Sequence, residues 1–344
     1  MNPYILSLLI SNLALGAIIT AASYHWFLAW IGLELNTLAI IPILAKQHHP
    51  RATEAATKYF ITQATASSII LFSSTINAWH TGTWDITQLT TFPTPIMLTI
   101  ALAMKLGLAP MHFWLPEVMQ GTDMTTALII ATWQKLPPIS LLYMSAKQLP
   151  TMLLLTLAIL STLIGGWAGL NQTQLRKIMA FSSIGHLGWM AAISTISQEL
   201  LIFTLTTYLL MTTSMFLTLI TLMAKTTKDL GTTWTTSPTL STTTLITLMA
   251  LGGLPPLTGF LPKWLILQEL TTNHLIPLAT ALALTSLLSL MFYMRLTYIT
   301  TLTTSPNTTT NTMKWRFKPT KPTNPTSTTV TLLLLIPITP LICT

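Results

Sequence analysis

Four ionisable side chains stand inside long apolar segments of this sequence: Glu34, Lys105, Lys135 and Lys263. Each such charge at the centre of a membrane helix costs about 2.5–3.5 kcal/mol to insert, so together they cost on the order of 10 kcal/mol unless they are paired or hydrated. One carboxylate cannot neutralise three lysines. A buried amine can release its proton near neutral pH, and a nearby carboxylate helps it to bind one again. We therefore predict a proton relay, with static salt bridges as the alternative.

Each of the three lysines also stands close to prolines in the sequence. Proline removes a backbone donor and frees a carbonyl, and non-helical backbone at membrane depth must be satisfied by protein or water. The sequence therefore predicts broken helices with water beside the breaks, in preference to simple kinks that serve packing. The neighbours are Pro110 for Lys105, Pro137 and Pro138 for Lys135, and Pro255, Pro256 and Pro262 for Lys263.

The segments that carry these residues belong to a strongly apolar chain. Of its 344 residues 51% are hydrophobic and 7% are charged, against about 25% charged in soluble domains. We predict an all-α polytopic membrane protein that forms a single membrane domain over residues 1–344, with about eleven helices of bilayer-spanning length. The apolar windows are 3–22, 24–44, 57–79, 96–115, 124–146, 150–171, 174–194, 199–223, 241–269, 274–299 and 328–342.

The net charge of +8 is explained by topology and gives no reason to expect nucleic-acid binding. With these windows, Lys147 alone falls on one side of the membrane, and eleven other basic residues fall on the opposite side. By the positive-inside rule the amino terminus and a loop over 300–327 face the cytoplasm or matrix, and a C-terminal helix over 328–344 crosses back. The eleven are Lys46, Arg51, Lys58, Arg176, Lys177, Lys225, Lys228, Lys314, Arg316, Lys318 and Lys321.

A short repeat links the fourth and ninth predicted helices. LG-LAPMHFWLPE, from Leu106, aligns with LGGLPPLTGFLPK, from Leu251, with one gap. Because the two copies lie five spans apart, they run in opposite directions across the membrane. This predicts two inverted five-helix repeats over 1–149 and 150–299, with helices 4 and 9 broken, which is an architecture of ion-coupled transporters.

Several cofactor classes have no recognisable site in the sequence. Its single cysteine, Cys343, cannot form an intrachain disulfide or hold an iron–sulfur cluster alone. We find no dinucleotide-binding glycine motif, Walker loop or HExxH motif. We therefore expect this chain to bind no nicotinamide, flavin or metal.

Five segments together resemble the antiporter-like membrane subunits of respiratory complex I, and the resemblance covers essentially the whole chain. It implies that Glu34 and Lys105 interact, that Lys135 connects the halves and that Lys263 serves the second half-channel. It also implies that His112 and His186 join a central hydrophilic axis, although both could equally be hydrogen-bonded core histidines. The segments are GLELNTLAI, AMKLGLAPMHFWLPEV, ATWQKLPP, FSSIGHLGWM and GGLPPLTGFLPKW.

The resemblance further implies a proton-translocating core subunit of NADH:ubiquinone oxidoreductase, driven by electron transfer elsewhere. NADH, FMN, iron–sulfur clusters and ubiquinone would then belong to partner subunits, and other complex I membrane and accessory subunits and phospholipids such as cardiolipin would surround the chain. It places the chain in the mitochondrial inner membrane, with its amino terminus in the matrix and its carboxyl terminus in the intermembrane space. Bacterial relatives carry three further helices before the first. A self-standing cation/proton antiporter and a membrane scaffold remain alternatives.

Overall fold

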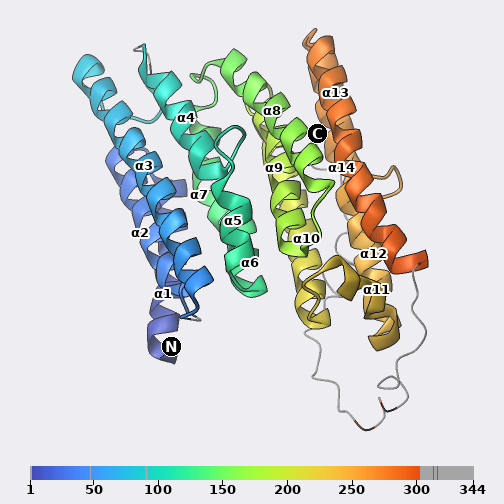
Figure 1. The fold of residues 1–344 in the computed structure, drawn as a ribbon. Coiled ribbons are helices and arrows are strands. Elements are labelled where there is room, and N and C mark those ends of the chain that lie inside the picture. Colours follow the sequence, from blue (N-terminus) through green and yellow to red (C-terminus); the bar gives the residue numbers. More distant parts are fainter. Residues whose placement is uncertain (1, 47, 90–91, 303–312, 314–315, 317–344) are drawn as a thin grey trace. The chain divides into compact units, whose positions relative to one another are not determined.

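The computed structural model describes residues 2–46, 48–89, 92–302, 313 and 316, and these residues are almost wholly helical (Figure 1). The predicted helix over 328–344 and nearly all of the predicted loop over 300–327 lie outside the described residues. The chain forms two compact units, residues 1–162 with 187–198 and residues 163–186 with 199–344. The division falls within two helices, α8 and α9. The two repeats expected over 1–149 and 150–299 stay a prediction.

The first unit contains three long helices followed by a series of short ones. α1 begins after Asn2, whose side chain accepts a hydrogen bond from the Tyr4 N–H at 3.2 Å, with Pro3 in its first turn. The helices are α1 (Pro3–Ala22), α2 (Trp26–Leu44), α3 (Pro50–Thr81), α4 (Thr94–Leu106), α5 (Trp114–Gly121), α6 (Met124–Ala131), the 3-10 helix η1 (Trp133–Lys135), α7 (Leu136–Ser145) and most of α8 (Thr151–Gly169).

One predicted span of the first unit, the window 124–146, is interrupted at Lys135, where the following prolines predicted a broken helix. α6 ends at Ala131 and η1 intervenes before α7 begins at Leu136. Pro137 and Pro138 stand in the first turn of α7, where a missing N–H is tolerated. In a helix that continued through this point, the two prolines would leave the carbonyls of Trp133 and Gln134 without hydrogen-bond donors. The prolines therefore restart the helix here.

The second unit contains the end of α8, the first part of α9, nearly all of α10, and α11 to α14. α11 occupies a stretch that the apolar windows left as a loop, and it begins with a capping box in which Thr226 and Asp229 bond each other's backbone. Burial alone would raise the pKa of Asp229, but hydrogen bonds from the Lys225 and Thr226 N–H groups hold it below its usual value. The helices are α9 (Leu175–Ile193), α10 (Gln198–Leu222), α11 (Thr227–Thr236), α12 (Pro238–Gly252), α13 (Phe260–Thr272) and α14 (Ile276–Leu302).

Within the described residues, five helices are long and apolar enough to cross a membrane: α1, α2, α8, α10 and residues 276–301 of α14. α4 is apolar but shorter. Because broken helices fall below this length, the count of eleven spans stays a prediction.

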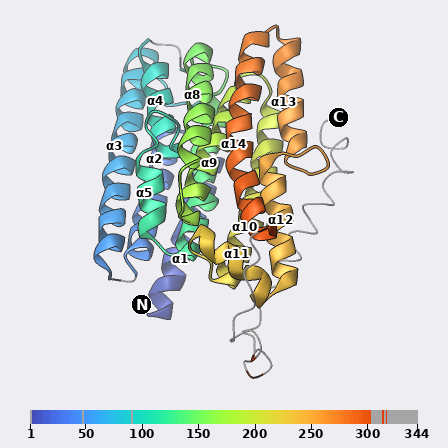
Figure 2. The ribbon, with the colours of Figure 1, turned by 45° about the vertical axis from the view of Figure 1, so that its right-hand side comes forward.

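α1 and α2 pack with their backbones in close contact, and Figure 2 shows α2 next to α3 in the same unit. A Cβ atom on Gly16 would lie 2.9 Å from the Gly32 carbonyl oxygen, and one on Gly32 would lie 2.6 Å from the Thr20 methyl group. Neither position has room for a larger residue. The tight contact fixes α2, which carries Glu34, against α1.

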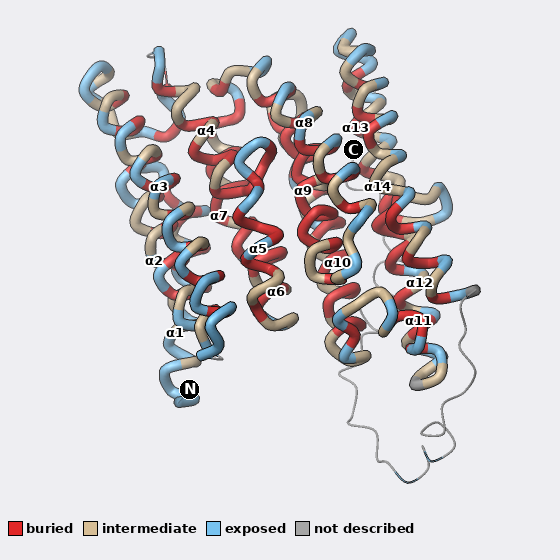
Figure 3. The backbone as a smooth tube through the Cα atoms, viewed as in Figure 1, coloured by how far each residue is buried: buried red, intermediate tan, exposed pale blue. Residues whose placement is uncertain are grey.

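The helices of both units carry many hydroxyl side chains that bond their own backbone. Thr20 donates to the Ala17 carbonyl at 2.8 Å, Ser73 to Ile70 at 2.8 Å and Thr244 to Ser241 at 2.7 Å. All three donors are buried, and Figure 3 colours the buried positions along the helices red. Back-bonding of this kind satisfies a hydroxyl without a tertiary partner.

Candidate functional site

The first helix break lies between α4 and α5. α4 ends at Leu106, Gly107 adopts a left-handed φ of 79°, and α5 begins only at Trp114. The Gly107 and Leu108 N–H groups both donate to the Ala103 carbonyl at 2.9 Å, which closes the helix end. The predicted interruption near Pro110 is confirmed.

The second break, between α12 and α13, has the same backbone form. α12 ends at Gly252, Gly253 has a φ of 81°, and α13 begins at Phe260. The interruption predicted near Pro255 and Pro256 is confirmed. In the structure the left-handed residue Gly107 corresponds to Gly253. The sequence alignment had paired Gly107 with the preceding residue, Gly252.

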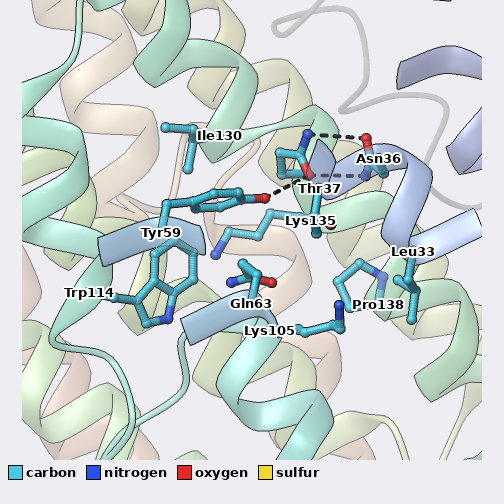
Figure 4. A pocket seen from close by; sticks show the side chains of 11 residues that line it. Leu33, Asn36, Thr37, Tyr59, Gln63, Lys105, Trp114, Ile130, Lys135 and Pro138 are labelled. Carbon is cyan, nitrogen blue, oxygen red and sulfur yellow. Dashed lines mark hydrogen bonds between the residues drawn. The ribbon is translucent and has the colours of Figure 1, made fainter. Parts of the chain in front are cut away.

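Two of the sequence-predicted lysines lie together at the first break. Lys105 and Lys135 are both buried and line one pocket formed by α2, α3, α4, α5, α6, η1 and α7 (Figure 4). The Lys135 amine donates to the carbonyl of Leu106, the last residue of α4, and lies 5.8 Å from the centre of the Trp114 ring. The Lys105 amine has no hydrogen-bond partner in the described part of the chain.

Glu34 is half-buried on α2 and does not bond Lys105 directly. Its carboxylate accepts a hydrogen bond from the Thr37 hydroxyl at 3.2 Å. Lys105 lines the pocket, whereas Glu34 is not among the residues that line it. The predicted interaction of the two residues in function stays a prediction.

Sequence reasoning missed a set of uncharged polar residues in this pocket. Asn36 and Gln134 form a reciprocal amide pair, with Nδ2 to Oε1 at 3.0 Å and Nε2 to Oδ1 at 3.1 Å. The Tyr59 hydroxyl also donates to Gln134 Oε1, at 3.3 Å. The available signal was their position, because Asn36 stands two residues after Glu34 and Gln134 directly precedes Lys135.

Lys263 and His186 lie in the second unit. Lys263 is half-buried and its amine donates to the Gly252 carbonyl at 3.0 Å, so it bonds the end of the broken helix α12. His186 packs against the Tyr208 ring at 5.5 Å between centroids. Lys263 and His186 belong to the same unit, and their shared role in a hydrophilic axis stays a prediction.

His112 lies in the first break itself. Its side chain is buried, its Nδ1 lies 3.2 Å from the Pro110 carbonyl oxygen, and its ring packs against Phe113 at 4.4 Å. An Nδ1–H donor satisfies that carbonyl and leaves Nε2 as an acceptor. This geometry is compatible with the core role that was weighed for His112 as well as with the hydrophilic axis.

A charged clip holds α5 to α3 beside the first break. The Lys58 amine lies 2.6 Å from Glu54 Oε1 and 2.7 Å from Glu117 Oε2. The hydrogen bond from Lys58, with its positive charge, lowers the pKa of Glu54. All three side chains are exposed, so the clip is solvated.

Comparisons with known proteins match this geometry to one family. The model for "NADH:quinone oxidoreductase/Mrp antiporter, TM" matches residues 23–289, and that for "NADH dehydrogenase subunit 2 C-terminus" matches residues 290–343. NADH-ubiquinone oxidoreductase chain 2 of Oncorhynchus mykiss is 58% identical over 290 residues, which cover 84% of this chain and 83% of the relative. The Xenopus laevis protein of the same name is 57% identical, covering 84% of each chain.

Solved structures agree in fold. A chain of respiratory complex I from Thermus thermophilus with bound aureothin gives a TM-score of 0.88 at 28% identity, covering 99% of this chain and 80% of that chain. A chain of the Mrp complex from Dietzia sp. DQ12-45-1b gives 0.83 at 15% identity, covering 97% and 75%. The second likeness shows the fold alone.

Proposed function

The chain belongs to the NADH:quinone oxidoreductase/Mrp antiporter family of membrane subunits, and we propose that it relays protons through Glu34, Lys105, Lys135 and Lys263. It is an integral membrane protein and an antiporter-like subunit of the NADH–ubiquinone oxidoreductase complex. In the proposed function, electron transfer in other subunits drives the relay. The chain itself then needs titratable groups inside the membrane and no redox centre.

The first break carries this proposal. It holds two buried amines, one bonded to the Leu106 carbonyl and the other without a hydrogen-bond partner among the described residues. Buried cations in a membrane protein are costly and mark ion or proton paths. A carbonyl freed by a helix break gives one amine a place to rest, and the absence of a fixed partner leaves the other amine able to exchange its proton.

Water completes the proposed path. Gln63 Nε2 is a second buried donor without a partner in the described part, and it lines the same pocket as Lys105. Buried donors are nearly always satisfied by an acceptor, and the pocket has room for about one water molecule. A water molecule here would accept from both nitrogens and extend the path beyond Lys105.

The remaining expectations form part of the same proposal. Protons would enter a hydrophilic axis to which His112 and His186 contribute, in two inverted repeats. The basic residues would face the matrix side of the mitochondrial inner membrane, with the amino terminus there and the carboxyl terminus in the intermembrane space. Their charges favour anionic phospholipids such as cardiolipin. NADH, FMN, iron–sulfur clusters and ubiquinone would be bound by other subunits.

A self-standing cation/proton antiporter is the second candidate, and the fold shared with an Mrp complex chain favours it as the rival. The two differ in their need for partners. A lone antiporter exchanges ions after purification and reconstitution by itself, whereas the proposed subunit pumps only within the assembled oxidoreductase. Ion exchange by the reconstituted single chain would therefore favour the rival.

The direct test replaces Lys105 by Arg and by Ala in the assembled complex. Arg keeps the positive charge but stays protonated at all working pH values, so we expect both variants to lose most proton pumping, with Arg disturbing assembly less. The measurement is proton translocation into sealed vesicles per electron delivered to quinone, with assembly checked on a native gel. Near-normal pumping by Lys105→Arg would show that Lys105 is only a fixed charge.

A further inference from the structure

The 3-10 helix η1 is bonded to three different helices by three consecutive side chains. Trp133 Nε1 donates to the Leu13 carbonyl of α1 at 3.1 Å, Gln134 pairs with Asn36 of α2, and Lys135 donates to the Leu106 carbonyl at the end of α4. A 3-10 segment inside a helical span has weaker internal hydrogen bonding than an α-helix. Its conformation therefore depends on these external contacts.

The middle contact is the most completely satisfied of the three. Asn36, Tyr59 and Gln134 are 2%, 2% and 8% exposed, so no bulk water competes for their hydrogen bonds. Gln134 Oε1 accepts from Asn36 and from Tyr59, and Gln134 Nε2 donates to Asn36. With both lone pairs of Oε1 used, rotation of the Gln134 amide would break every one of these bonds. The amide is fixed in one orientation.

This pair joins the backbone segments that carry two of the ionisable residues. Asn36 lies on α2 two residues beyond Glu34, and Gln134 is the residue before Lys135, although the two partners are 98 positions apart in the sequence. In Figure 4 the dashed bonds from Asn36 and from the Tyr59 hydroxyl meet at one amide side chain, with Lys135 close by. The amide pair thus links the Glu34 helix to the Lys135 turn.

We propose that Asn36 and Gln134 are positioning residues, which fix the turn that carries Lys135 against the helix that carries Glu34. This inference rests on the proposed relay. The pair itself exchanges no proton in this role. It holds the Lys135 amine at the Leu106 carbonyl and over Trp114, in a fixed relation to the carboxylate of the neighbouring helix.

A packing role makes a different prediction from a positioning role. Buried hydrogen bonds contribute little net stability when both partners are replaced by apolar groups of the same shape, whereas removing one partner leaves the other unsatisfied. If Asn36 and Gln134 only fill space, an apolar pair should serve as well as the amides. If their directed bonds set the geometry of η1, it should not.

The experiment compares Asn36→Leu, Gln134→Met, the double variant of both, and the exchange Asn36→Gln with Gln134→Asn, all in the assembled oxidoreductase. We expect the single variants to lower both assembly and protons pumped per electron. The apolar double variant should recover assembly but stay well below wild-type pumping, with the pH profile of pumping moved by about half a unit or more. The exchange variant, which keeps an amide pair, should recover most of the pumping.

Ser145→Ala is the matched control, because Ser145 is fully buried in α7 and its hydroxyl donates to the Leu141 carbonyl of its own helix. It should pump normally. Wild-type pumping and pH profile in the apolar double variant would overturn the inference. If that variant does not assemble, Tyr59→Phe decides, since it removes one bond to Gln134. A displaced pH profile in Tyr59→Phe supports the positioning role, and an unchanged one overturns it.

The failure of this inference can be told from the failure of the relay. Normal pumping by Lys135→Arg would overturn the relay through this lysine, whatever the amide variants do. Loss of pumping in Lys135→Arg together with normal pumping in the apolar double variant would keep the relay and overturn only the positioning role.

Discussion

At the first helix break, Lys135 bonds the end of α4 from 29 residues further along the chain, whereas at the second break Lys263 bonds the end of α12 from 11 residues along. Both lysines donate to the carbonyl of the last helical residue before a left-handed glycine. The two breaks therefore have the same backbone form, but the lysine that bonds the helix end comes from a different part of the chain in each. The first needs tertiary structure to bring the lysine in, and the second needs only the helix that follows the break.

The surroundings of the two lysines differ accordingly. Lys135 is 1% exposed and shares its pocket with Lys105 and an amide pair. Lys263 is half-buried in its unit, and the αL residue Gly253 stands directly against it, with a Cβ position 2.8 Å from the amine. Lys135 is therefore enclosed by several helices, whereas the contacts described for Lys263 come from the helix end and turn that directly precede its own helix. Substitutions should separate the two cases.

The largest difference is expected between Lys135→Arg and Lys263→Arg. Both arginines stay protonated, so both variants should lose most proton pumping. At position 135 the larger guanidinium must also fit a fully enclosed site, and overpacking of that kind typically costs about 1–3 kcal/mol, so assembly should fall as well. Pumping per electron and the native-gel yield of the complex measure the two effects. Equal assembly of both variants would contradict the contrast drawn between the two breaks.

Gly259→Ala should damage the second break almost as severely, by a steric route. Its Cβ would lie 1.8 Å from the Ala250 carbonyl oxygen, which belongs to the backbone of α12. We expect a loss of about 3 kcal/mol or more, seen as a failure of the variant to accumulate in the assembled complex. Gly185→Ala in α9 is the control, because no atom of the described residues lies within 4 Å of its Cβ position and a helical alanine is favoured by about 0.5–1 kcal/mol. Normal yield of Gly259→Ala would refute the tight packing of this turn.

Gly107→Ala and Gly253→Ala test the two left-handed caps directly. Each imposes about 1–2 kcal/mol of backbone strain, because both residues have φ near 80°. The new methyl group at position 107 meets Leu115 at 3.2 Å, whereas at position 253 it meets the Lys263 amine at 2.8 Å. The two variants should therefore lose similar thermal stability, but only Gly253→Ala should alter the pH profile of pumping. An identical change of pH profile in both would erase the distinction.

The smallest effects are expected outside the spans. There the second unit carries the α11 capping box and the first unit carries the exposed ion pairs of Lys58. Asp229→Ala removes the side-chain half of the α11 capping box and should cost about 1 kcal/mol, with little dependence on salt. Lys58→Met removes the exposed α3–α5 clip and should change thermal stability less, with an effect that fades as salt is added. Thermal denaturation of the detergent-solubilised complex at two salt concentrations separates them. A larger loss in Lys58→Met would contradict this ranking.

The Asp229 prediction also fixes a pH dependence. Hydrogen bonding holds the pKa of Asp229 below its usual 3.8, so its contribution to stability is present above that value and is lost as the pH falls through the folded-state pKa. The wild type should therefore lose stability faster than Asp229→Ala on acidification below about pH 4. Parallel pH curves for the two proteins would show that the carboxylate does not act as a cap.

Local signals in the sequence were sufficient to predict both helix breaks. Pro110 and the Pro255–Pro256 pair remove backbone donors wherever they fall, so their effect does not depend on the rest of the fold. The prolines after Lys135 likewise predicted a broken helix, and the structure adds that this pair stands in the first turn of α7 and so starts the next helix. The capping box Thr226–Asp229 was not predicted, although a short polar motif between two apolar windows is the local signal for one.

The contacts that complete the site could not be predicted in the same way. Asn36 and Gln134 meet across 98 residues, and nothing in either local segment specifies the other. The same holds for Lys58 and Glu117, which are 59 residues apart. A single sequence shows which side chains are costly to bury. The tertiary packing of α2, α3 and η1 decides which of these side chains become hydrogen-bond partners.

The back-bonded hydroxyls have a consequence for how this chain enters a lipid bilayer. A threonine whose hydroxyl already donates to its own helix, as Thr75 does to Phe72 at 2.8 Å and Thr156 to Leu153 at 2.9 Å, presents mainly its methyl group outward. Both side chains are exposed in the structure, yet their transfer from water to hydrocarbon leaves no donor unsatisfied. Hydropathy scales that count each threonine as polar therefore overstate the partitioning cost of these helices. Threonine can occupy lipid-facing positions here at close to the cost of an aliphatic residue.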